Sequence, residues 1–251
     1  MTTSASAGAA AAPGFFPDNP TLLQRMAGVL VRPGRTVDRV IAEPQWRGVL
    51  LASTLVAILA GASVMSTAVG RQALVDEWER TAAALGHEVG DAGYGELEGL
   101  SQYAPAYAAA GALASGPLLA IGLTGLLSVV FGRRRHQGRP GFTTVFAVVV
   151  HAGVVLSLRQ IVAAGLLYAR ETTASALALG AWFPGLDAAS PTARALGFID
   201  LFVLWWVVVV AIGTARLYHR RVRATALGFV GVYFALGLLT AAAFAAAGGT
   251  A

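Results

Sequence analysis

Five apolar stretches, each long enough to cross a lipid bilayer, dominate this chain of 251 residues. A transmembrane helix needs about 20 consecutive apolar residues. The sequence offers such stretches at 47–69, 105–131, 142–168, 195–217 and 224–246. Only 12% of the residues are charged, about half of what a soluble domain carries. Because backbone groups in a bilayer must be hydrogen-bonded within the protein, we predict an all-α, polytopic membrane protein built as a five-helix bundle.

The arginines predict how this bundle is oriented. Thirteen of the eighteen precede or begin the first stretch or lie in the two segments 132–141 and 216–223. The other two connections hold four arginines and nine of the thirteen acidic residues. Since loops rich in arginine stay in the cytoplasm, we predict a cytoplasmic N-terminus and an outer tail at 247–251. The use of arginine with no lysine indicates a GC-rich genome, and therefore a bacterial inner membrane.

The segment before the first stretch has two parts. Residues 1–19 are rich in Ala, Ser, Gly and Pro, which predicts a disordered cytoplasmic tail. Residues 20–46 contain two short amphipathic patterns, separated by Pro33 and Gly34. They predict interfacial helices on the inner leaflet, with helices packed beneath the bundle as the alternative.

Ionisable groups inside the apolar stretches are candidate functional residues, because burying a charge in lipid is costly. Counting 1.5 Å per residue from the middle of each stretch places Arg159 and Asp200 at similar depth, which predicts an ion pair. His151 lies at the depth of Thr124 and Ser128, and we expect it to hydrogen-bond one of these hydroxyls. The alternative is that these groups form a path for protons or ions.

The second stretch carries a row of small residues spaced four apart. Residues at this spacing share one helix face, and small side chains there let another backbone approach closely. We expect the row to pack another helix of the same chain, with a partner subunit of a homo-oligomer as the alternative. Its members are Ala108, Ala112, Gly116 and Ala120.

Two arginine clusters flank the apolar stretches on the predicted cytoplasmic side. Basic residues there meet anionic lipid headgroups, or they could dock an acidic partner; we do not expect nucleic acid. The clusters are Arg133, Arg134 and Arg135, and Arg220 and Arg221. The chain has no Cys and shows no motif of a nucleophile, metal centre or cofactor, so we expect no enzyme, metal or cofactor.

Three sequence segments resemble the Yip-domain family, in its bacterial branch. The first contains Pro33, followed by Pro44 and Trp46 at the entry to the first stretch. The second is the basic, glycine-containing turn that leads into 142–149. The third is the pattern D-x-F-x-x-W with a later glycine, formed by Asp200, Phe202, Trp205 and Gly213. The resemblance extends over residues 22–246, although a proline of the family is missing near 154–157.

This resemblance implies a five-span bundle, a cytoplasmic N-terminal segment and no catalytic residues. Some bacterial relatives accompany exporters of the ABC type. We therefore expect a non-enzymatic scaffold or accessory protein that acts on lipid or on a membrane partner complex. The alternative is a small transporter or channel that uses His151, Arg159 and Asp200.

Overall fold

The computed structural model describes residues 20–84, 87, 89–132, 140–170, 177–183, 185 and 196–248. The predicted tail 1–19, most of the predicted tail 247–251, and Arg133, Arg134 and Arg135 lie outside the described residues. The named elements of the described part are all helical. In chain order they are α1 Leu22–Val31, α2 Pro33–Ala42, α3 Arg47–Met65, α4 Ala68–Ala84, α5 Asp91–Leu100, η1 Ser101–Tyr103, α6 Ala104–Gly132, α7 Phe142–Ala152, α8 Val154–Arg170, η2 Leu179–Trp182, α10 Leu201–Leu217 and α11 Val222–Gly248.

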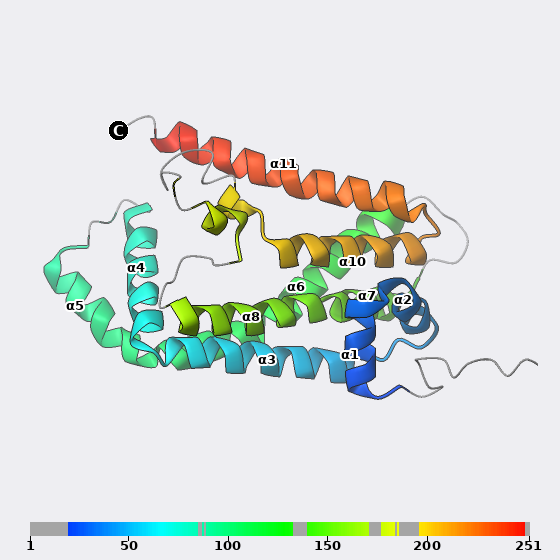
Figure 1. The fold of residues 1–251 in the computed structure, drawn as a ribbon, viewed down its shortest axis with the longest axis horizontal. Coiled ribbons are helices and arrows are strands. Elements are labelled where there is room, and N and C mark those ends of the chain that lie inside the picture. Colours follow the sequence, from blue (N-terminus) through cyan, green and yellow to red (C-terminus); the bar gives the residue numbers. More distant parts are fainter. Residues whose placement is uncertain are drawn as a thin grey trace, which may run out of the picture.

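The long helices lie side by side along the axis of one bundle (Figure 1). Helix α3 packs against α6 and α8, and α10 packs against α7, α8 and α11. Helices α1 and α2 lie at one end of the bundle, and α4 and α5 lie at the other (Figure 1). The core between the helices is rich in valine, with the largest share from α7 and further valines from α2, α8 and α10. These β-branched side chains have few rotamers and fill the space between closely packed helices.

Four helical segments are long and apolar enough to cross a membrane, among the residues that the structure describes. They are Arg47–Met65, Asp91–Gly132, Phe142–Tyr168 and Val222–Thr240. The chain is therefore an all-α membrane protein. The predicted stretch 195–217 forms a shorter helix, because α10 begins only at Leu201 and has 17 residues. At 1.5 Å per residue α10 is about 26 Å long, slightly less than the hydrocarbon thickness of about 30 Å.

Two predicted stretches contain a break. The first ends as a helix at Met65, and the chain turns through Ser66 and Thr67. The Thr67 hydroxyl accepts a hydrogen bond from the Gly70 amide, as an N-cap residue does. The third is divided at Gly153 into α7 and α8. Hydropathy missed both breaks because turn residues inside an apolar stretch hardly change its average.

Helices α1 and α2 have apolar faces that are covered by protein. Thr21 and Gln24 form a capping box at the start of α1, and Pro33 occupies the first turn of α2, where its missing N–H costs nothing. Val29, Val37 and Val40 are almost completely buried in the same core as α7 and α10. These valines therefore pack against the bundle, and the location of α1 and α2 on the inner leaflet stays a prediction.

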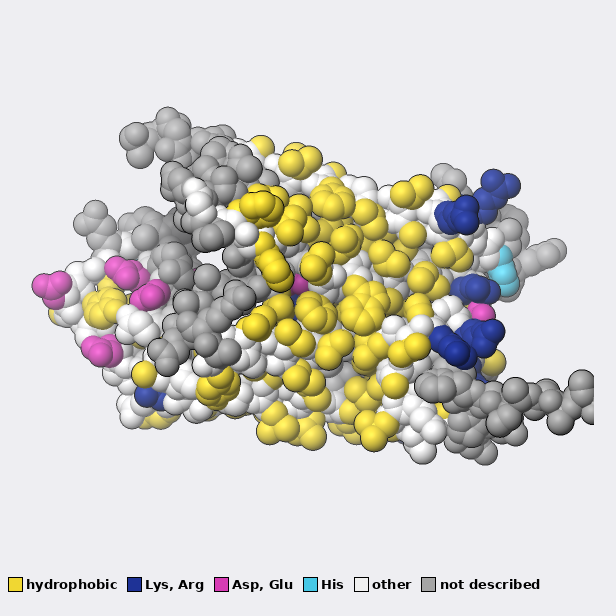
Figure 2. Space-filling model, in the orientation of Figure 1, with side chains coloured by type: hydrophobic (Ala, Val, Ile, Leu, Met, Phe, Trp, Pro, Cys, Tyr) yellow, Lys and Arg dark blue, Asp and Glu magenta, His cyan; other side chains and the backbone are white. Residues whose placement is uncertain are grey.

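Charged side chains gather at the two ends of the bundle, with an apolar surface between them (Figure 2). Arginines lie at the end that carries α1 and α2, and acidic side chains lie at the end of α4 and α5 (Figure 2). Many large apolar side chains between the ends are more than half exposed, including Leu55, Leu126 and Leu238. An apolar surface of this kind is suited to contact with lipid tails.

Candidate functional site

The structure brings together Arg159 and Asp200. These are the two charged residues for which counting along the sequence predicted similar depths in the membrane. The Nε–H of Arg159 donates a hydrogen bond of 2.7 Å to Oδ2 of Asp200. The Asp200 side chain is 7% exposed and that of Arg159 is 33% exposed. The pair connects α8 to the beginning of α10, so it joins two segments that lie 41 residues apart.

Asp200 is also the N-cap of α10 and not an interior residue of a span. Its Oδ1 accepts hydrogen bonds from the amides of Phe202 and Val203, at 2.8 and 3.2 Å. A carboxylate in this position satisfies free N–H groups and interacts favourably with the helix dipole. Both oxygens of the buried carboxylate are therefore bonded within the protein.

Tyr233 of α11 is the third member of this site, and sequence reasoning missed it. Its hydroxyl accepts a 3.1 Å hydrogen bond from the Asp200 amide and donates a 2.8 Å bond to the carbonyl of Phe198. Arg159, Asp200 and Tyr233 thus connect α8, α10 and α11, and we call them the clamp. A buried Tyr hydroxyl requires a partner, so a tyrosine amid apolar residues was the available signal.

His151 makes a local hydrogen bond. Its Nδ1 lies 2.7 Å from the carbonyl of Ala147, while its Nε2 has no hydrogen-bond partner among the described residues. The expected bond to Thr124 or Ser128 does not form within the described residues. Thr124 donates to the carbonyl of Ala120 and Ser128 donates to that of Thr124, as hydroxyls inside helices commonly do.

A small polar cavity of about 200 Å³ lies beside His151 at the arginine-rich end. Arg25, Arg39 and Glu43 also line it. Arg25 donates to the side chain of Gln45 at 2.6 Å, whereas its buried Nε has no partner among the described residues. This cavity is separate from the clamp, since none of the clamp residues lines it.

The small-residue row of α6 packs closely against another helix of the same chain only at Ala108, among the contacts described. A β-carbon added at Gly61 of α3 would lie 3.5 Å from that of Ala108, so the two backbones approach closely there. Further along, Ala112, Gly116 and Ala120 line a cavity of about 350 Å³ between α3, α6, α7 and α8. A row of small residues predicts a contact between helices, but it does not predict a cavity beside that contact.

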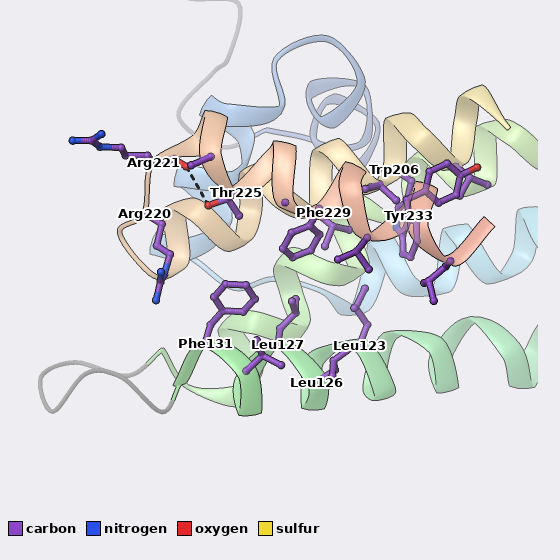
Figure 3. A pocket seen from close by; sticks show the side chains of 18 residues that line it. Leu123, Leu126, Leu127, Phe131, Trp206, Arg220, Arg221, Thr225, Phe229 and Tyr233 are labelled. Carbon is purple, nitrogen blue, oxygen red and sulfur yellow. Dashed lines mark hydrogen bonds between the residues drawn. The ribbon is translucent and has the colours of Figure 1, made fainter. Parts of the chain in front are cut away.

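A larger apolar groove lies between α6, α10 and α11 (Figure 3). It has a volume of about 910 Å³. Leu127 of α6, Val210 of α10 and Phe229 of α11 are among the residues that line it. Arg220 and Arg221 lie at one end (Figure 3). We call this the α6/α10/α11 groove.

The residues that carried the family resemblance occupy helix ends and helix contacts. Pro33 starts α2, and Pro44 lies in the connection to α3. Trp46 precedes α3 and meets the ring of Phe146 edge-on, at 5.1 Å. In α10, the rings of Phe202 and Trp205 are 6.3 Å apart, and Gly213 lies against Val148 of α7. Such positions determine helix packing.

Comparison with models of protein families shows which family the chain belongs to. The family model described as the Yip1 domain matches residues 27–244, which include α2 to α10 and all of α11 except its last residues. The chain belongs to the Yip1 domain family. No curated protein and no solved structure matches this Yip1 domain chain. The Yip1 domain is a family of membrane proteins, in agreement with the spanning helices.

Proposed function

We propose that this Yip1 domain protein is a non-enzymatic scaffold or accessory protein that binds lipid or a membrane partner. The clamp is the main support for this proposal. Both oxygens of Asp200 are bonded to Arg159 and to the start of α10. In these contacts Asp200 uses its charge to hold helices together, as a structural residue of a scaffold does.

The proposed partner is another integral membrane protein, such as an exporter of the ABC type. We expect mild crosslinking in native membranes, followed by affinity purification and mass spectrometry, to recover one membrane complex in a constant ratio to this chain. An untagged chain treated in the same way is the control. Recovery of the chain alone would contradict an accessory role with a protein partner.

For its orientation in the cell membrane, we propose that the arginine-rich end faces the cytoplasm. The chain lacks cysteine, so single cysteines report position without background. We expect a membrane-impermeant maleimide to label Gly95→Cys, at the acidic end, in intact cells. Leu23→Cys, at the arginine-rich end and 77% exposed, should be labelled only after lysis. The reverse pattern would overturn the proposed orientation.

Transport is the second candidate function, and one observation favours it. The unpartnered Nε2 of His151 is a buried polar atom beside the small polar cavity, and such atoms in membrane helices are often functional. Flux of protons or solutes into liposomes that His151→Ala abolishes would establish transport. Such flux would overturn the scaffold proposal.

A further inference from the structure

The α6/α10/α11 groove has the length of one membrane leaflet. Its α11 side extends from Ala224 to Leu236, which is about 18 Å along a helix. The hydrocarbon of one leaflet is about 15 Å thick, half of the total. A chain lying in the groove, parallel to the helices, would therefore extend from the headgroup level to about the middle of the bilayer.

The walls of the groove are apolar and come from three helices. Leu127 and Val210, each 3% exposed, lie deep within it, and its other walls carry Leu123 and Trp206. Phe131 and Phe229, with stacked rings 6.0 Å apart, lie near the end that carries the arginines (Figure 3). Such a lining binds hydrocarbon and does not stabilise a polar solute.

The charged end of the groove is suited to a phosphate group. Arg220 and Arg221 are both exposed there, and neither makes an ion pair within the described part of the chain. The guanidinium of Arg220 lies 5.6 Å from the centre of the Phe131 ring, a cation–π contact that orients it. Arginine binds phosphate through several N–H groups at once.

The groove offers about 910 Å³. Lipid tails are thin and flexible, and they can fill such a space.

We propose that the α6/α10/α11 groove binds one phospholipid with an anionic headgroup. Its tail lies against Leu127 and Val210, and its phosphate meets Arg220 and Arg221. Two unpaired arginines favour a headgroup that keeps a net negative charge over a zwitterionic one. This proposal deepens the lipid-binding part of the proposed function, on which it rests, by naming the class of lipid and its place. The site requires only that the protein is in a membrane, so lipid binding and the protein partner are tested by separate experiments.

Native mass spectrometry of the purified full chain in detergent tests this site, with phosphatidylglycerol and phosphatidylcholine as probes. Wild type should retain one phosphatidylglycerol and bind phosphatidylcholine about tenfold more weakly. The double variant Arg220→Gln/Arg221→Gln should lose about tenfold in affinity for phosphatidylglycerol, because charge-assisted hydrogen bonds are removed. Arg223→Gln is the matched control, since Arg223 is exposed on the same turn but does not line the groove.

A second pair of variants tests whether the tail occupies the groove. Gly228 lines the groove, and a β-carbon there would meet no atom within 4 Å. Gly228→Leu should therefore fill the space and abolish retention without lowering the melting temperature. Gly231 is equally open but lies outside the groove, so Gly231→Leu should bind like wild type.

Three results would overturn the proposal. Unchanged lipid retention in Gly228→Leu would show that the tail lies elsewhere. Equal affinity for the two phospholipids would remove the role of the arginines. A dimer without bound lipid, lost in Gly228→Leu, would show that a second copy of the chain is the occupant. Melting measurements on each variant distinguish these outcomes from unfolding.

Discussion

Asp200→Ala should lower the free energy of unfolding by about 3 kcal/mol, the low end of the range for breaking a buried ion pair. We take the low end because the Arg159 side chain remains one-third exposed. The substitution leaves the Arg159 charge without its partner and removes the cap of α10. Thermal melting in detergent measures the loss as a fall in melting temperature.

Two further variants separate the ion pair from a general effect of charge. Asp200→Ala combined with Arg159→Leu should be more stable than Asp200→Ala alone, because no unpaired charge remains. Asp38→Ala breaks the ion pair between Asp38 and Arg216, in which both side chains are about half exposed. It should lower the free energy of unfolding by less than about 1 kcal/mol. If the double variant melts no higher than the less stable single variant, the pair does not stabilise the bundle.

Gly213→Ala should destabilise the protein by about 2 kcal/mol, as overpacking of a tight core does. A β-carbon at Gly213 would overlap a methyl group of Val148 across the contact between α10 and α7. In a helix, alanine is otherwise more favourable than glycine by about 1 kcal/mol. A net loss of stability would therefore show that the overlap with Val148 outweighs this preference. Chemical or thermal unfolding in detergent measures it.

A double-mutant cycle checks the cause of this effect. Val148→Ala removes the methyl groups that Gly213→Ala would meet, so the two substitutions together should cost less than the sum of their separate effects. Gly228→Ala is the matched control, because Gly228 has open space around it and should be unchanged or slightly stabilised. Strict additivity of the cycle would contradict a direct contact between the two residues.

The sequence predicted which segments are helical, because an apolar run of span length has one stable conformation in lipid. It also paired Arg159 with Asp200, since depth follows from counting residues along a helix. Hydropathy alone placed Asp200 inside a span. The signal for the later start of α10 was Asp200 itself, because Asp is preferred at N-caps. There it accepts hydrogen bonds from the amides of Phe202 and Val203.

Other parts of the site depend on neighbours that are distant in sequence. The contact of Tyr233 with Asp200 and Phe198 requires the positions of α10 and α11, and periodicity along one helix does not determine them. The α6/α10/α11 groove is likewise a space between three helices. The sequence predicted Arg220 and Arg221 as lipid-facing charges, but it did not indicate the apolar groove beside them.

The short length of α10 has a consequence for how the protein is inserted during synthesis. A segment of 17 residues is shorter than the usual span of about 20, and the carboxylate of Asp200 at its start adds to the cost of entering the membrane. Arg159 is made 41 residues earlier, so α8 is in place when α10 leaves the ribosome. We expect α10 to enter the bilayer beside α8, with Arg159 neutralising Asp200, and α11 to retain it there through Tyr233. The order of helices along the chain thus provides Asp200 with its partner in advance.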